Sequence, residues 1–544
     1  MSAITVSELE FAHPGGDSLF FDVTFSVAPG EHAAVVGTNG SGKSTLLQVL
    51  AGELEADEGV WALGGEVLYM PQDVGMRPGV SVREMLTDLA PPALRAAGRR
   101  LLATEVAAAE GRPGDAMDLA SAISDWSDLG GYDLEQRWDA AADRTVRSSI
   151  GDLGDRPAAH LSGGERKRLV LDVLLRSDAT ILLLDEPDNY LDVPARMQLE
   201  TDLATSRKTI LMVSHDRTVL SRAATKIVTL EGSSCWTHNG SYATYADARE
   251  HRQEALGDEL QRWKDEERRL YRHMKIMKQR ASLNPKNASK ANAAESRWER
   301  FVKVGPPPEP VKDQRPQVSF RGADSPRRVV KLVDVGIDLL FEPFSDEIHF
   351  GERIGLVGSN GTGKTHLLDV LERPDAPHTG SVQFGPRTSV GRFTQVNSRP
   401  DFAGRTPLDI VVDRLTEVER SMKALARYGL VGAANREYET LSGGQRARLE
   451  ILCLDLEGHN VLLLDEPTDN LDVESSSALE DALDRFVGTV VAVSHDRAFL
   501  ARMSRFLLIA DDGAVFDLPD YETALAALTD PDGIYDLTLA KLLS

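Results

Sequence analysis

The sequence predicts an α/β fold in which two copies of one domain, each built on a parallel sheet, are joined by an α-helical hairpin. Four motifs, GTNGSGKST, LSGGERKR, ILLLDEPDNYLD and VSHDR, recur in the same order as GSNGTGKTH, LSGGQRAR, VLLLDEPTDNLD and VSHDR. Within each copy, short apolar runs typical of buried parallel strands alternate with patterns typical of helices. Between the copies, apolar residues follow a helical period instead.

The spacing of the motifs indicates that the two copies are versions of one domain. From the LSGG serine to the glutamate of LLLLDE is 24 residues in both copies, and from that glutamate to the VSHDR histidine is 29 in both. From the GK lysine to the LSGG serine the distance differs, at 119 residues in the first copy and 78 in the second. The first copy therefore carries about 41 additional residues before its LSGG motif.

We expect three domains, spanning residues 1–245, 246–316 and 317–544. The additional residues of the first domain fall within 87–147, a stretch whose Ala- and Leu-rich sequence (LRAAGRRLLATEVAAAEG) predicts helices. An enlarged helical lobe of the first domain is the simpler interpretation of this stretch. A separate partner-binding arm is the alternative.

The segment 246–316 predicts a helical hairpin. Its first part has an apolar stripe spaced four and three residues apart, with Glu267 as the one polar break. The stripe consists of Leu256, Leu260, Trp263, Leu270, Met274 and Met277. An Asn-Pro turn signal follows, then a shorter amphipathic pattern over 291–301 that GPPPEP ends. The first helix is expected to span about 35 residues, or roughly 50 Å.

The overall composition limits the possible classes of protein. A net charge of -24 over 544 residues argues against a protein that coats nucleic acid, so any such contact needs a local basic patch. Two cysteines, Cys235 and Cys453, exclude a disulfide framework or a four-thiolate cluster, and we expect free thiols in a reducing cytosol. The first residues lack the features of a signal peptide, and no run approaches the roughly 18 apolar residues of a membrane span. A cytoplasmic location is therefore expected.

The GxxxxGK[ST] motif predicts a phosphate-binding loop in each copy. Glycines let backbone N–H groups approach phosphate oxygens at a helix N-terminus, and each motif here lies between an apolar strand and a helix pattern. The lysines would reach the β- and γ-phosphates, and the hydroxyl residue that follows would bind Mg²⁺. The residues assigned to the two loops are Gly37, Asn39, Gly40, Gly42, Lys43, Ser44, Thr45, Gly358, Asn360, Gly361, Gly363, Lys364, Thr365 and His366.

The LLLLDE motifs predict the catalytic carboxylates. A buried strand presents two carboxylates at its C-terminal end, where α/β folds bind ligands. Asp185 and Asp465 would hold Mg²⁺ through its waters, and Glu186 and Glu466 would orient the attacking water and accept its proton. An incidental pair of surface carboxylates is implausible directly after such an apolar run.

Three further motifs suit contacts with nucleotide. Each LSGG serine can offer a hydroxyl and backbone N–H groups at a helix start. His215 and His495, each after an apolar strand and at equal offsets from the two glutamates, can contact the γ-phosphate. Gln72, in YMPQD, and Gln395, in RFTQV, could contact Mg²⁺ and the water. A lone histidine or glutamine would more often be structural, and the repeat is what favours function here.

This motif set resembles that of the ATP-binding cassette (ABC) superfamily, with Walker A, Q-loop, LSGG signature, Walker B, D-loop and switch histidine all present twice. Two tandem cassettes, a charged helical linker and no membrane domain are similar to the ABC-F family. Its members act on ribosomes, as translation factors or as antibiotic-resistance proteins. The resemblance covers both copies and implies an ATPase that uses ATP and Mg²⁺.

The resemblance also implies composite sites and a monomer whose two cassettes pair within the chain. In such sites the Walker and switch residues of one cassette face the signature residues of the other. The implied pairings are Lys43, Asp185, Glu186 and His215 with Ser442, Gly443 and Gly444, and Lys364, Asp465, Glu466 and His495 with Ser162, Gly163 and Gly164.

The sequence departs from the family pattern DEPTNHLD. It has Asp188 and Tyr190 in the first cassette, and Asp469 and Asn470 in the second. The Asp-Glu pair survives in both, so hydrolysis is expected in both. Phe11 is the candidate for stacking on adenine in the first cassette, whereas the matching region of the second, VVKLVDVGIDLL, has no aromatic residue.

The linker is the expected RNA-binding element. Its segment NASKANAAESR, 287–297, resembles the P-site tRNA-interaction motif of the ABC-F family. Eight basic residues occur from 268 to 290 without an acidic residue between them, whereas a merely soluble helix normally mixes both signs. They are Arg268, Arg269, Arg272, Lys275, Lys278, Arg280, Lys286 and Lys290.

Three functions remain open on the sequence. The first is a ribosome-associated ATPase that binds rRNA and tRNA, either a translation factor or a resistance protein, with DEPTDNLD slightly favouring the macrolide-resistance branch. The second is the ATPase subunit of a membrane transporter with separate permeases, and the third is a DNA-repair ATPase. The basic linker and the in-chain pairing of cassettes favour the first.

Overall fold

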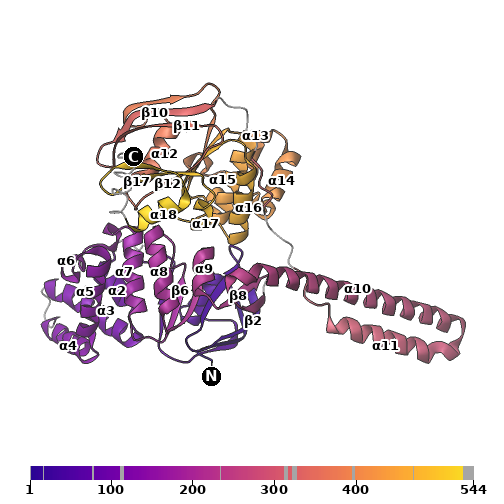
Figure 1. The fold of residues 1–544 in the computed structure, drawn as a ribbon. Helices are drawn as coiled ribbons and strands as arrows, with labels where there is room; N and C mark the ends of the chain where they lie inside the picture. The colour runs from indigo at the N-terminus through magenta and orange to yellow at the C-terminus, as the bar shows by residue number, and fades with distance from the viewer. Residues whose placement is uncertain are drawn as a thin grey trace. The chain divides into compact units, whose positions relative to one another are not determined.

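The computed structural model forms two compact units, one of Met1–Asn239 with Gln314–Ser544 and one of Gly240–Asp313. The first unit holds both copies of the repeat, here called cassette 1 (before the linker) and cassette 2 (after it), and the second unit is the linker (Figure 1). The described residues are 2–15, 18–75, 79–110, 115–232, 234–310, 316–320, 327–394, 399–469 and 471–530.

The core of cassette 1 is a six-stranded sheet in the order β5-β6-β7-β3-β8-β9, in which only β9 is antiparallel to its neighbour. All five residues of β6 and of β7 are buried, as their continuous apolar sequences predict for strands covered on both faces. The strands are β3 (His32–Gly37), β5 (Val67–Met70), β6 (Ile181–Asp185), β7 (Thr209–Val213), β8 (Lys226–Glu231) and β9 (Ser234–Asn239). The carboxyl ends of β3, β6 and β7 therefore lie together and carry the motifs.

Helices and a smaller sheet complete the α/β part of cassette 1. The antiparallel sheet β2-β1-β4 and α1 share one apolar cluster with the six-stranded sheet. These elements are β1 (Ile4–Ala12), β2 (Ser18–Val27), β4 (Glu58–Leu63), α1 (Lys43–Leu50), α7 (Gly163–Leu175), α8 (Val193–Thr205) and α9 (Arg217–Ala223).

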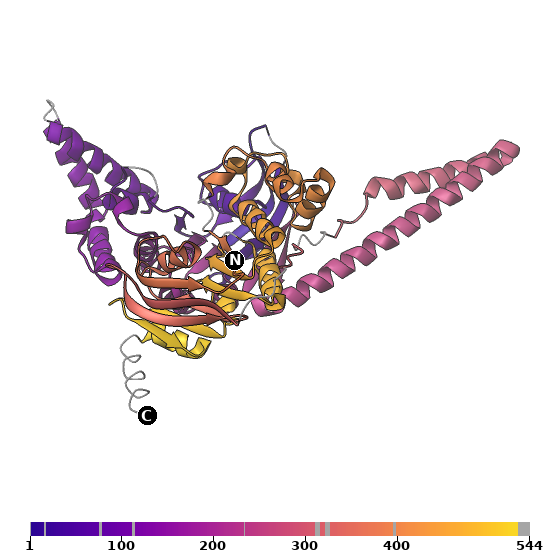
Figure 2. The ribbon, with the colours of Figure 1, turned by 90° about the horizontal axis from the view of Figure 1, so that it is seen from above.

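The described residues of 87–147 are mostly helical, as the composition of this stretch predicts. Helices α3 and α4 run side by side (Figure 2), and the buried rings of Trp126 and Trp138 lie 6.3 Å apart between α4 and α5. Gly131 begins α5 where a Cβ would come within 2.1 Å of the Trp126 indole, so glycine permits this close approach. The helices are α2 (Val82–Asp88), α3 (Pro92–Glu110), α4 (Asp115–Asp128), α5 (Gly131–Val146) and α6 (Ile150–Leu153).

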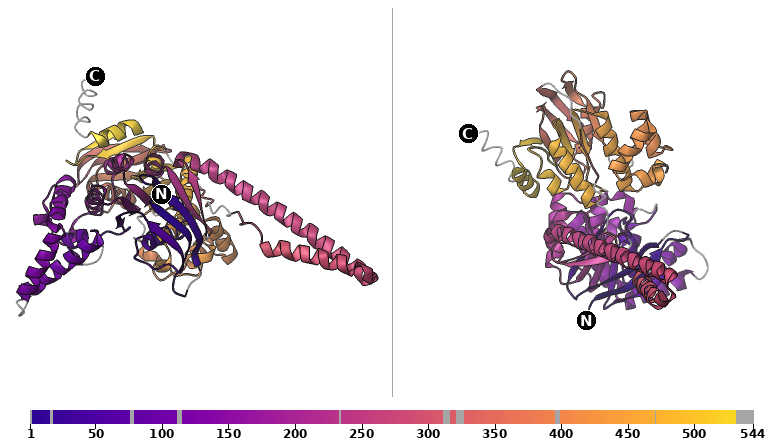
Figure 3. Two further views of the ribbon diagram at one scale, coloured as in Figure 1. Left: turned by 90° about the horizontal axis from the view of Figure 1, so that it is seen from below. Right: turned by 90° about the vertical axis from the view of Figure 1, so that its right-hand side faces the viewer.

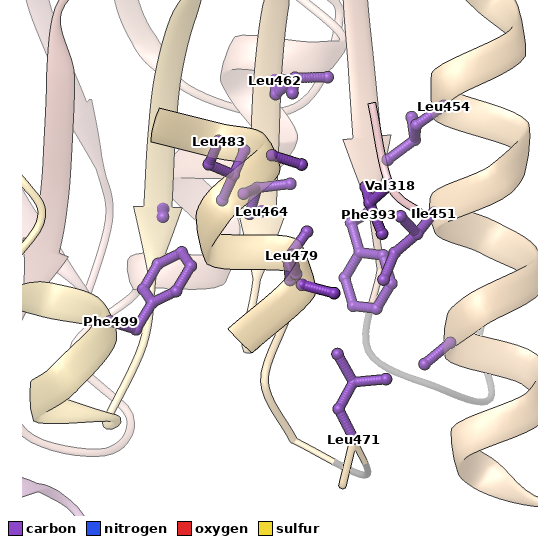
Figure 4. Packing of buried hydrophobic residues seen from close by; sticks show 14 of the residues in the cluster. Val318, Phe393, Ile451, Leu454, Leu462, Leu464, Leu471, Leu479, Leu483 and Phe499 are labelled. Atoms are coloured by element: carbon purple, nitrogen blue, oxygen red, sulfur yellow. The ribbon is translucent and has the colours of Figure 1, made fainter. Parts of the chain in front are cut away.

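Cassette 2 repeats the topology, with a six-stranded sheet in the order β14-β15-β16-β12-β17-β18 and a three-stranded sheet in the order β11-β10-β13. Figure 4 shows its core, where Leu464 of β15 and Phe393 of β14 pack near Ile451 of α15 and Leu479 of α16. The strands are β10 (Arg328–Ile337), β11 (Phe341–His349), β12 (Arg353–Val357), β13 (Thr379–Phe384), β14 (Val390–Phe393), β15 (Val461–Asp465), β16 (Thr489–Val493), β17 (Arg505–Ile509) and β18 (Val515–Leu518).

The helices of cassette 2 show where the two copies differ. Between β14 and α15 only α13 and α14 stand, among the described residues, in place of the larger lobe of cassette 1, which accounts for the difference in motif spacing. The helices are α12 (Lys364–Glu372), α13 (Pro407–Leu415), α14 (Val418–Arg427), α15 (Gly443–Glu457), α16 (Val473–Arg485), α17 (Arg497–Leu500) and α18 (Tyr521–Thr529).

The linker is a helical hairpin of α10 (Tyr245–Leu283) and α11 (Ala288–Val304), which lie antiparallel and side by side (Figure 3). The first helix has 39 residues, slightly more than expected. The rings of Trp263 and Phe301 stack 5.4 Å apart. Glu267, the one polar residue in the apolar stripe of α10, accepts a hydrogen bond from Trp298 Nε1 of α11 at 3.1 Å.

Among the described residues, the structure has no helix that combines the length and apolar character needed to cross a membrane.

Candidate active sites

The two glycine-rich loops have the backbone of phosphate cradles. Gly40 and Gly42 have φ of 85° and 90°, and Gly361 and Gly363 have φ of 91° and 97°, a left-handed conformation that favours glycine. A Cβ at Gly37 would come within 2.4 Å of the Leu230 carbonyl oxygen, so this position too requires glycine. Each loop leads directly into the N-terminus of a helix, where backbone N–H groups can bind a polyphosphate.

The loop lysines are buried and turned onto their own loops. Lys43 Nζ donates to the carbonyl oxygens of Gly37 and Thr38 at 3.0 and 3.1 Å, and Lys364 makes the equivalent bonds at 2.9 and 2.7 Å. Burial lowers the pKa of both ammonium groups, and nearby carboxylates oppose that shift. Each ammonium is therefore held inside its loop, where an anion would stabilise its charge.

A hydroxyl and a carboxylate meet below each loop. Ser44 Oγ donates to Asp185 Oδ1 at 3.1 Å, and Thr365 Oγ1 donates to Asp465 Oδ1 at 3.3 Å. Burial raises the pKa of both aspartates, which favours a nearby cation that would restore the charged form. Oxygen donors of this kind are what Mg²⁺ prefers, so the residues fit that ion.

The two glutamates after these aspartates have a strained backbone. Glu186 and Glu466 have φ of 47° and 46°, and their N–H groups donate to the carbonyl oxygens of Val213 and Val493 at 2.9 and 3.0 Å. A left-handed conformation is uncommon for residues other than glycine and is frequent at functional sites. The strain occurs at equivalent positions of both cassettes.

Polar side chains surround Glu186. Gln72 Nε2 donates to Glu186 Oε2 at 2.8 Å, and Asn189 Nδ2 donates to the same oxygen. His215 Nε2 lies 3.8 Å from Glu186 Oε1. The structure therefore brings the Q-loop glutamine, the Walker B glutamate and the switch histidine of cassette 1 together.

The equivalent group in cassette 2 has a different set of contacts. His495 Nε2 lies 3.5 Å from Glu466 Oε1 and 3.1 Å from Asn360 Oδ1. Asn360 Nδ2 donates in turn to the carbonyl oxygen of Tyr190 in cassette 1, at 3.2 Å. Gln395, the predicted second Q-loop residue, lies outside the described residues.

The electrostatic surroundings give the two glutamates pKa values near neutral pH. Burial, then Asp185, raises the pKa of Glu186 to about 7, and burial, then Asp469, raises the pKa of Glu466 to about 8. Burial, then the loop lysine, lowers the pKa of His215 to about 3 and that of His495 well below its ordinary value. Both histidines are therefore neutral in this state.

Two cavities combine residues of both cassettes. Site 1 has a volume of about 330 Å³ and joins the Walker A loop of cassette 1 to the signature of cassette 2. Site 2, of about 360 Å³, joins the Walker A loop of cassette 2 to the signature of cassette 1. Their motif linings are Asn39, Gly40, Gly42, Lys43, Ser44, Thr45, Gln72, Glu186, His215, Ser442, Gly443 and Gly444, and Asn360, Gly361, Gly363, Lys364, Thr365, His366, Asp465, Glu466, His495, Ser162, Gly163 and Gly164.

The signature serines begin helices. Ser162 Oγ accepts from the N–H of Glu165 at 3.2 Å at the start of α7, and Ser442 Oγ accepts from the N–H of Gln445 at 3.3 Å at the start of α15. Both are capping boxes, so the local sequence fixes each helix start. Each site thus combines two helix N-termini, one from each cassette, which suits an anion.

The expected position of Phe11 needs correction. Its ring is 6% exposed, packs against Phe20 in the core of cassette 1 and does not line site 1. His13 and Leu19 line that cavity instead. Phe11 lies on the buried face of β1, whereas the exposed His13 lies just beyond the end of that strand.

Arg392, which lies outside the motifs, contacts Asp465, the carboxylate of cassette 2 that is expected to bind Mg²⁺. Arg392 Nη2 donates to Asp465 Oδ2 at 3.4 Å, and Arg392 also pairs with Asp369. The equivalent position of cassette 1, which lies in β5, is Tyr69. Alignment of the two copies beyond the motifs would have found this difference.

A second asymmetry lies near the D-loops. Arg196, which is 5% exposed, donates from Nη1 to Asp216 Oδ2 at 3.2 Å, whereas cassette 2 has Ser476 in its place. Tyr190 has φ of 66°, is 49% exposed and lines site 2, while the equivalent residue of cassette 2 lies outside the described part of the chain. The two sites are therefore chemically different.

Three of the eight basic residues predicted to bind RNA form ion pairs within the linker. Arg268 pairs with Asp265 at 3.4 Å, Arg269 with Glu266 at 2.6 Å, and Lys278 with Glu295 of α11. The expectation of a wholly free basic side was wrong for these three, because acidic residues just outside the run reach into it. Within the described part of the chain, the others are exposed and have no ion pair, namely Arg272, Lys275, Arg280, Lys286 and Lys290.

Comparisons with known proteins agree with this geometry. The sequence profile of the family described as ABC transporter matches residues 20–189 and 341–469. An antibiotic resistance protein of Mycobacteroides abscessus is 39% identical over 544 residues, covering 95% of this chain and 98% of the relative. The tylosin resistance ATP-binding protein TlrC of Streptomyces fradiae is 33% identical over 530 residues, covering 91% and 94%.

A solved structure shares the fold. The archaeal ribosome recycling factor aABCE1, in complex with the ribosomal stalk protein aP1, gives a TM-score of 0.59 at 19% identity, covering 95% of this chain and 91% of that chain.

The chain therefore belongs to the ABC transporter family, and it is an ATPase with two cassettes in one polypeptide. ABC transporter F family member 5 of Arabidopsis thaliana is 29% identical over 529 residues, covering 92% of this chain and 74% of that relative.

Proposed function

We propose that this chain hydrolyses ATP at two composite sites and uses that cycle to act on the ribosome, which it contacts through the linker. The observation that carries the proposal is that each cavity combines a phosphate loop of one cassette with the signature of the other. ATP bound in either cavity would hold the cassettes together, and its hydrolysis would release them.

The same chemistry is proposed for each site. Lys43 and Lys364 bind the β- and γ-phosphates, and the signature serines and glycines contact the nucleotide from the opposite side. Glu186 and Glu466 orient the attacking water and, in their charged form, accept its proton. Their pKa values of about 7 and about 8 lie near neutral pH, which suits a general base. The neutral histidines can donate from one ring nitrogen to the γ-phosphate.

Mg²⁺ is the proposed cofactor. Ser44 and Asp185 would hold it in site 1, and Thr365 and Asp465 in site 2, with the Q-loop glutamines near it. The ion would neutralise and orient the phosphates. Arg392 gives Asp465 a competing positive charge, so site 2 is expected to bind the ion more weakly.

The linker is the proposed ribosome-binding element, and the three-domain division with a linker near 246–316 is part of this proposal. The exposed basic residues near the turn of the hairpin suit a backbone of phosphates, and a net charge of -24 for the whole chain would otherwise repel RNA. The archaeal protein aABCE1, which shares the fold, is named as a ribosome recycling factor, and this supports the same partner. A cytoplasmic location follows from this partner.

One experiment tests both parts of the proposal. The double variant Glu186→Gln, Glu466→Gln should bind ATP and nearly abolish turnover, because the phosphate cradle remains while water orientation is lost. It should then sediment with ribosomes when ATP is present. Near-normal turnover would contradict the catalytic assignment, and ATP-dependent retention on membranes or duplex DNA would support a different partner.

A second candidate function within this proposal is resistance to ribosome-targeting antibiotics. Two relatives are named for antibiotic resistance, and one of them for tylosin, a macrolide. Expression of the chain in a drug-sensitive host should raise the inhibitory concentration of a macrolide, and the double glutamine variant should not. Equal sensitivity with and without the chain, across ribosome-targeting drugs, would favour a translation factor.

A further inference from the structure

The VSHDR motif carries an arginine two residues after each switch histidine, and the mechanism above does not use it. Arg217 and Arg497 are the first residues of the short helices α9 and α17. The intervening aspartates cap these helices, with Asp216 Oδ1 accepting from the N–H of Thr218 at 2.8 Å and Asp496 doing the same at 2.9 Å in cassette 2. Each histidine is thus connected to its arginine through a fixed turn.

Each of these arginines reaches a buried glutamate of the opposite cassette. Arg217 is bidentate, donating from Nη2 to Glu480 Oε1 at 2.7 Å and from Nη1 to Glu480 Oε2 at 3.2 Å. Arg497 Nη2 pairs with Glu200 Oε1 of cassette 1. The side chains of Glu480 and Glu200 are 1% and 2% exposed, so both carboxylates are removed from water.

Each buried glutamate also has an arginine from its own cassette. Arg222 Nη1 lies 3.1 Å from Glu200 Oε2, and Arg502 Nη2 lies 3.1 Å from Glu480 Oε2. Both of these arginines follow the cross-cassette arginine by five residues. The two cassettes therefore carry the same device, a carboxylate held by one guanidinium of its own cassette and one of the other.

The helices that carry the glutamates begin at the active sites. Asp472 caps α16, and its carboxylate interacts electrostatically with Lys43 and His215 of site 1. Glu480 lies two turns further along the same helix. One end of α16 therefore faces site 1, and its middle holds the segment that carries the switch histidine of that site.

We propose that Arg217 and Arg497 are positioning residues that clamp each switch-histidine segment to the opposite cassette, so that a histidine is correctly placed only when the cassettes are closed. This inference rests on the roles proposed above for His215 and His495. Bidentate arginine–carboxylate pairs are geometrically specific, which suits positioning better than general attraction. When the cassettes separate, each glutamate keeps its own arginine and loses the other.

The chain offers a matched control. Arg217→Ala and Arg502→Ala each remove one of the two arginines on Glu480, but only the first removes a link between cassettes. Arg497→Ala and Arg222→Ala form the same comparison on Glu200. In a Lys364→Ala background, which leaves site 1, we expect Arg217→Ala to lower kcat roughly tenfold to a hundredfold with little change in KM, because small misplacements near the reacting groups are costly. In the same background, Arg502→Ala should leave kcat nearly unchanged.

Two further measurements separate positioning from folding. Thermal unfolding checks that both alanine variants fold, and Arg217→Lys, which keeps the charge without the bidentate fork, should restore part of kcat. In the Glu186→Gln, Glu466→Gln background, energy transfer between dyes on the two cassettes should show less ATP-driven closure with Arg217→Ala than with Arg502→Ala.

Equal kcat and equal closure for Arg217→Ala and Arg502→Ala would overturn the clamp. His215→Ala, measured in parallel, distinguishes this failure from failure of the proposed mechanism. An inactive His215→Ala with a fully active Arg217→Ala would refute the clamp alone. A fully active His215→Ala would instead refute the role of the histidine on which the clamp depends.

Discussion

At the scale of single residues, burial decides the chemistry of the two sites. The aspartates, glutamates, lysines and histidines of the motifs are ordinary titratable groups, but the sheet ends and loops remove them from water. Glu186 and Glu466 consequently titrate near neutral pH, and His215 and His495 are neutral. Bound nucleotide and Mg²⁺ would replace the missing solvation with charges of defined position.

The raised pKa values predict a pH-dependent stability of the nucleotide-free chain. Glutamates titrate near 4.5 when unfolded, whereas Glu186 and Glu466 titrate at about 7 and about 8 when folded. Between these values the folded state binds more protons, so the free energy of unfolding falls as pH rises from about 4.5 to about 8. The double glutamine variant should lack this component, which is about 1.4 kcal/mol per pH unit for each glutamate and about 2 to 3 kcal/mol per pH unit for the two together below pH 7. Denaturant unfolding at pH 5.5 and 8 measures the free energy of unfolding of the unmodified chain and of the double variant. The same change in this free energy between the two pH values for both proteins would contradict the prediction.

His13 is expected to support the adenine ring at site 1. In a Lys364→Ala background, which leaves site 1, His13→Ala should weaken binding of a fluorescent ATP analogue about fivefold, since base stacking is worth about 1–3 kcal/mol and imidazole is a small platform. Phe11→Leu, in the core beside it, should lower stability and leave affinity nearly unchanged. Weaker binding of the analogue by Phe11→Leu, with unchanged binding by His13→Ala, would instead assign adenine stacking to Phe11.

At the scale of elements, the motifs could be predicted because each one has a local cause. The glycines of the phosphate loops need left-handed backbone, the LSGG serines cap helices, and the LLLLD runs suit buried strands. The helical stretch 87–147 and the linker hairpin followed from composition and periodicity in the same way. These features depend on neighbours in the sequence, so the sequence alone reveals them.

Features set by tertiary contacts were missed or misjudged. Phe11 lies within β1 and is buried, whereas His13 lies just beyond the end of the strand and is exposed, and the sequence alone does not place that end. The ion pair of Lys278 with Glu295 joins two helices of the hairpin, and that of Arg392 with Asp465 joins two strands. The composite lining of both sites entered the sequence interpretation through family resemblance, because no local pattern encodes which cassette faces which.

The linker structure sharpens the RNA-binding prediction. Arg272, Lys275 and Arg280 are exposed and have no ion pair within the described residues, so their reversal to glutamate should abolish ribosome sedimentation at physiological salt. Basal ATPase activity should persist, because the catalytic groups lie in the cassettes. A milder variant with alanine at these positions should reduce the salt slope of binding by about 2 to 3.

A matched control comes from the paired residues of the same hairpin. Arg268, Arg269 and Lys278 already neutralise carboxylates, so their change to alanine should weaken ribosome binding less than change of the unpaired three. Equal losses from the two triple variants would mean that ion pairing within the hairpin does not select the RNA contacts. Undiminished, salt-insensitive binding after charge reversal would leave the hairpin as a spacer.

At the scale of the whole molecule, the repeat creates two similar sites that are not identical. Arg196 corresponds to Ser476 in the repeat, Tyr69 corresponds to Arg392, and Tyr190 lines site 2 but not site 1. Such differences allow one site to retain nucleotide while the other turns over. Because each cavity draws on both cassettes, neither cassette is expected to hydrolyse ATP by itself.

The central claim is that each site is shared between the cassettes, and single-turnover hydrolysis in a Lys364→Ala background tests it most directly. This background removes the phosphate-loop lysine of site 2 and keeps Lys43, so site 1 remains unchanged. We expect Gly443→Asp, a change in cassette 2, to abolish the remaining hydrolysis, because a carboxylate would enter site 1 beside the γ-phosphate. Gly163→Asp, the equivalent change within cassette 1, should leave that hydrolysis intact. Loss of activity with Gly163→Asp and its survival with Gly443→Asp would mean that each cassette works alone, and would contradict the account.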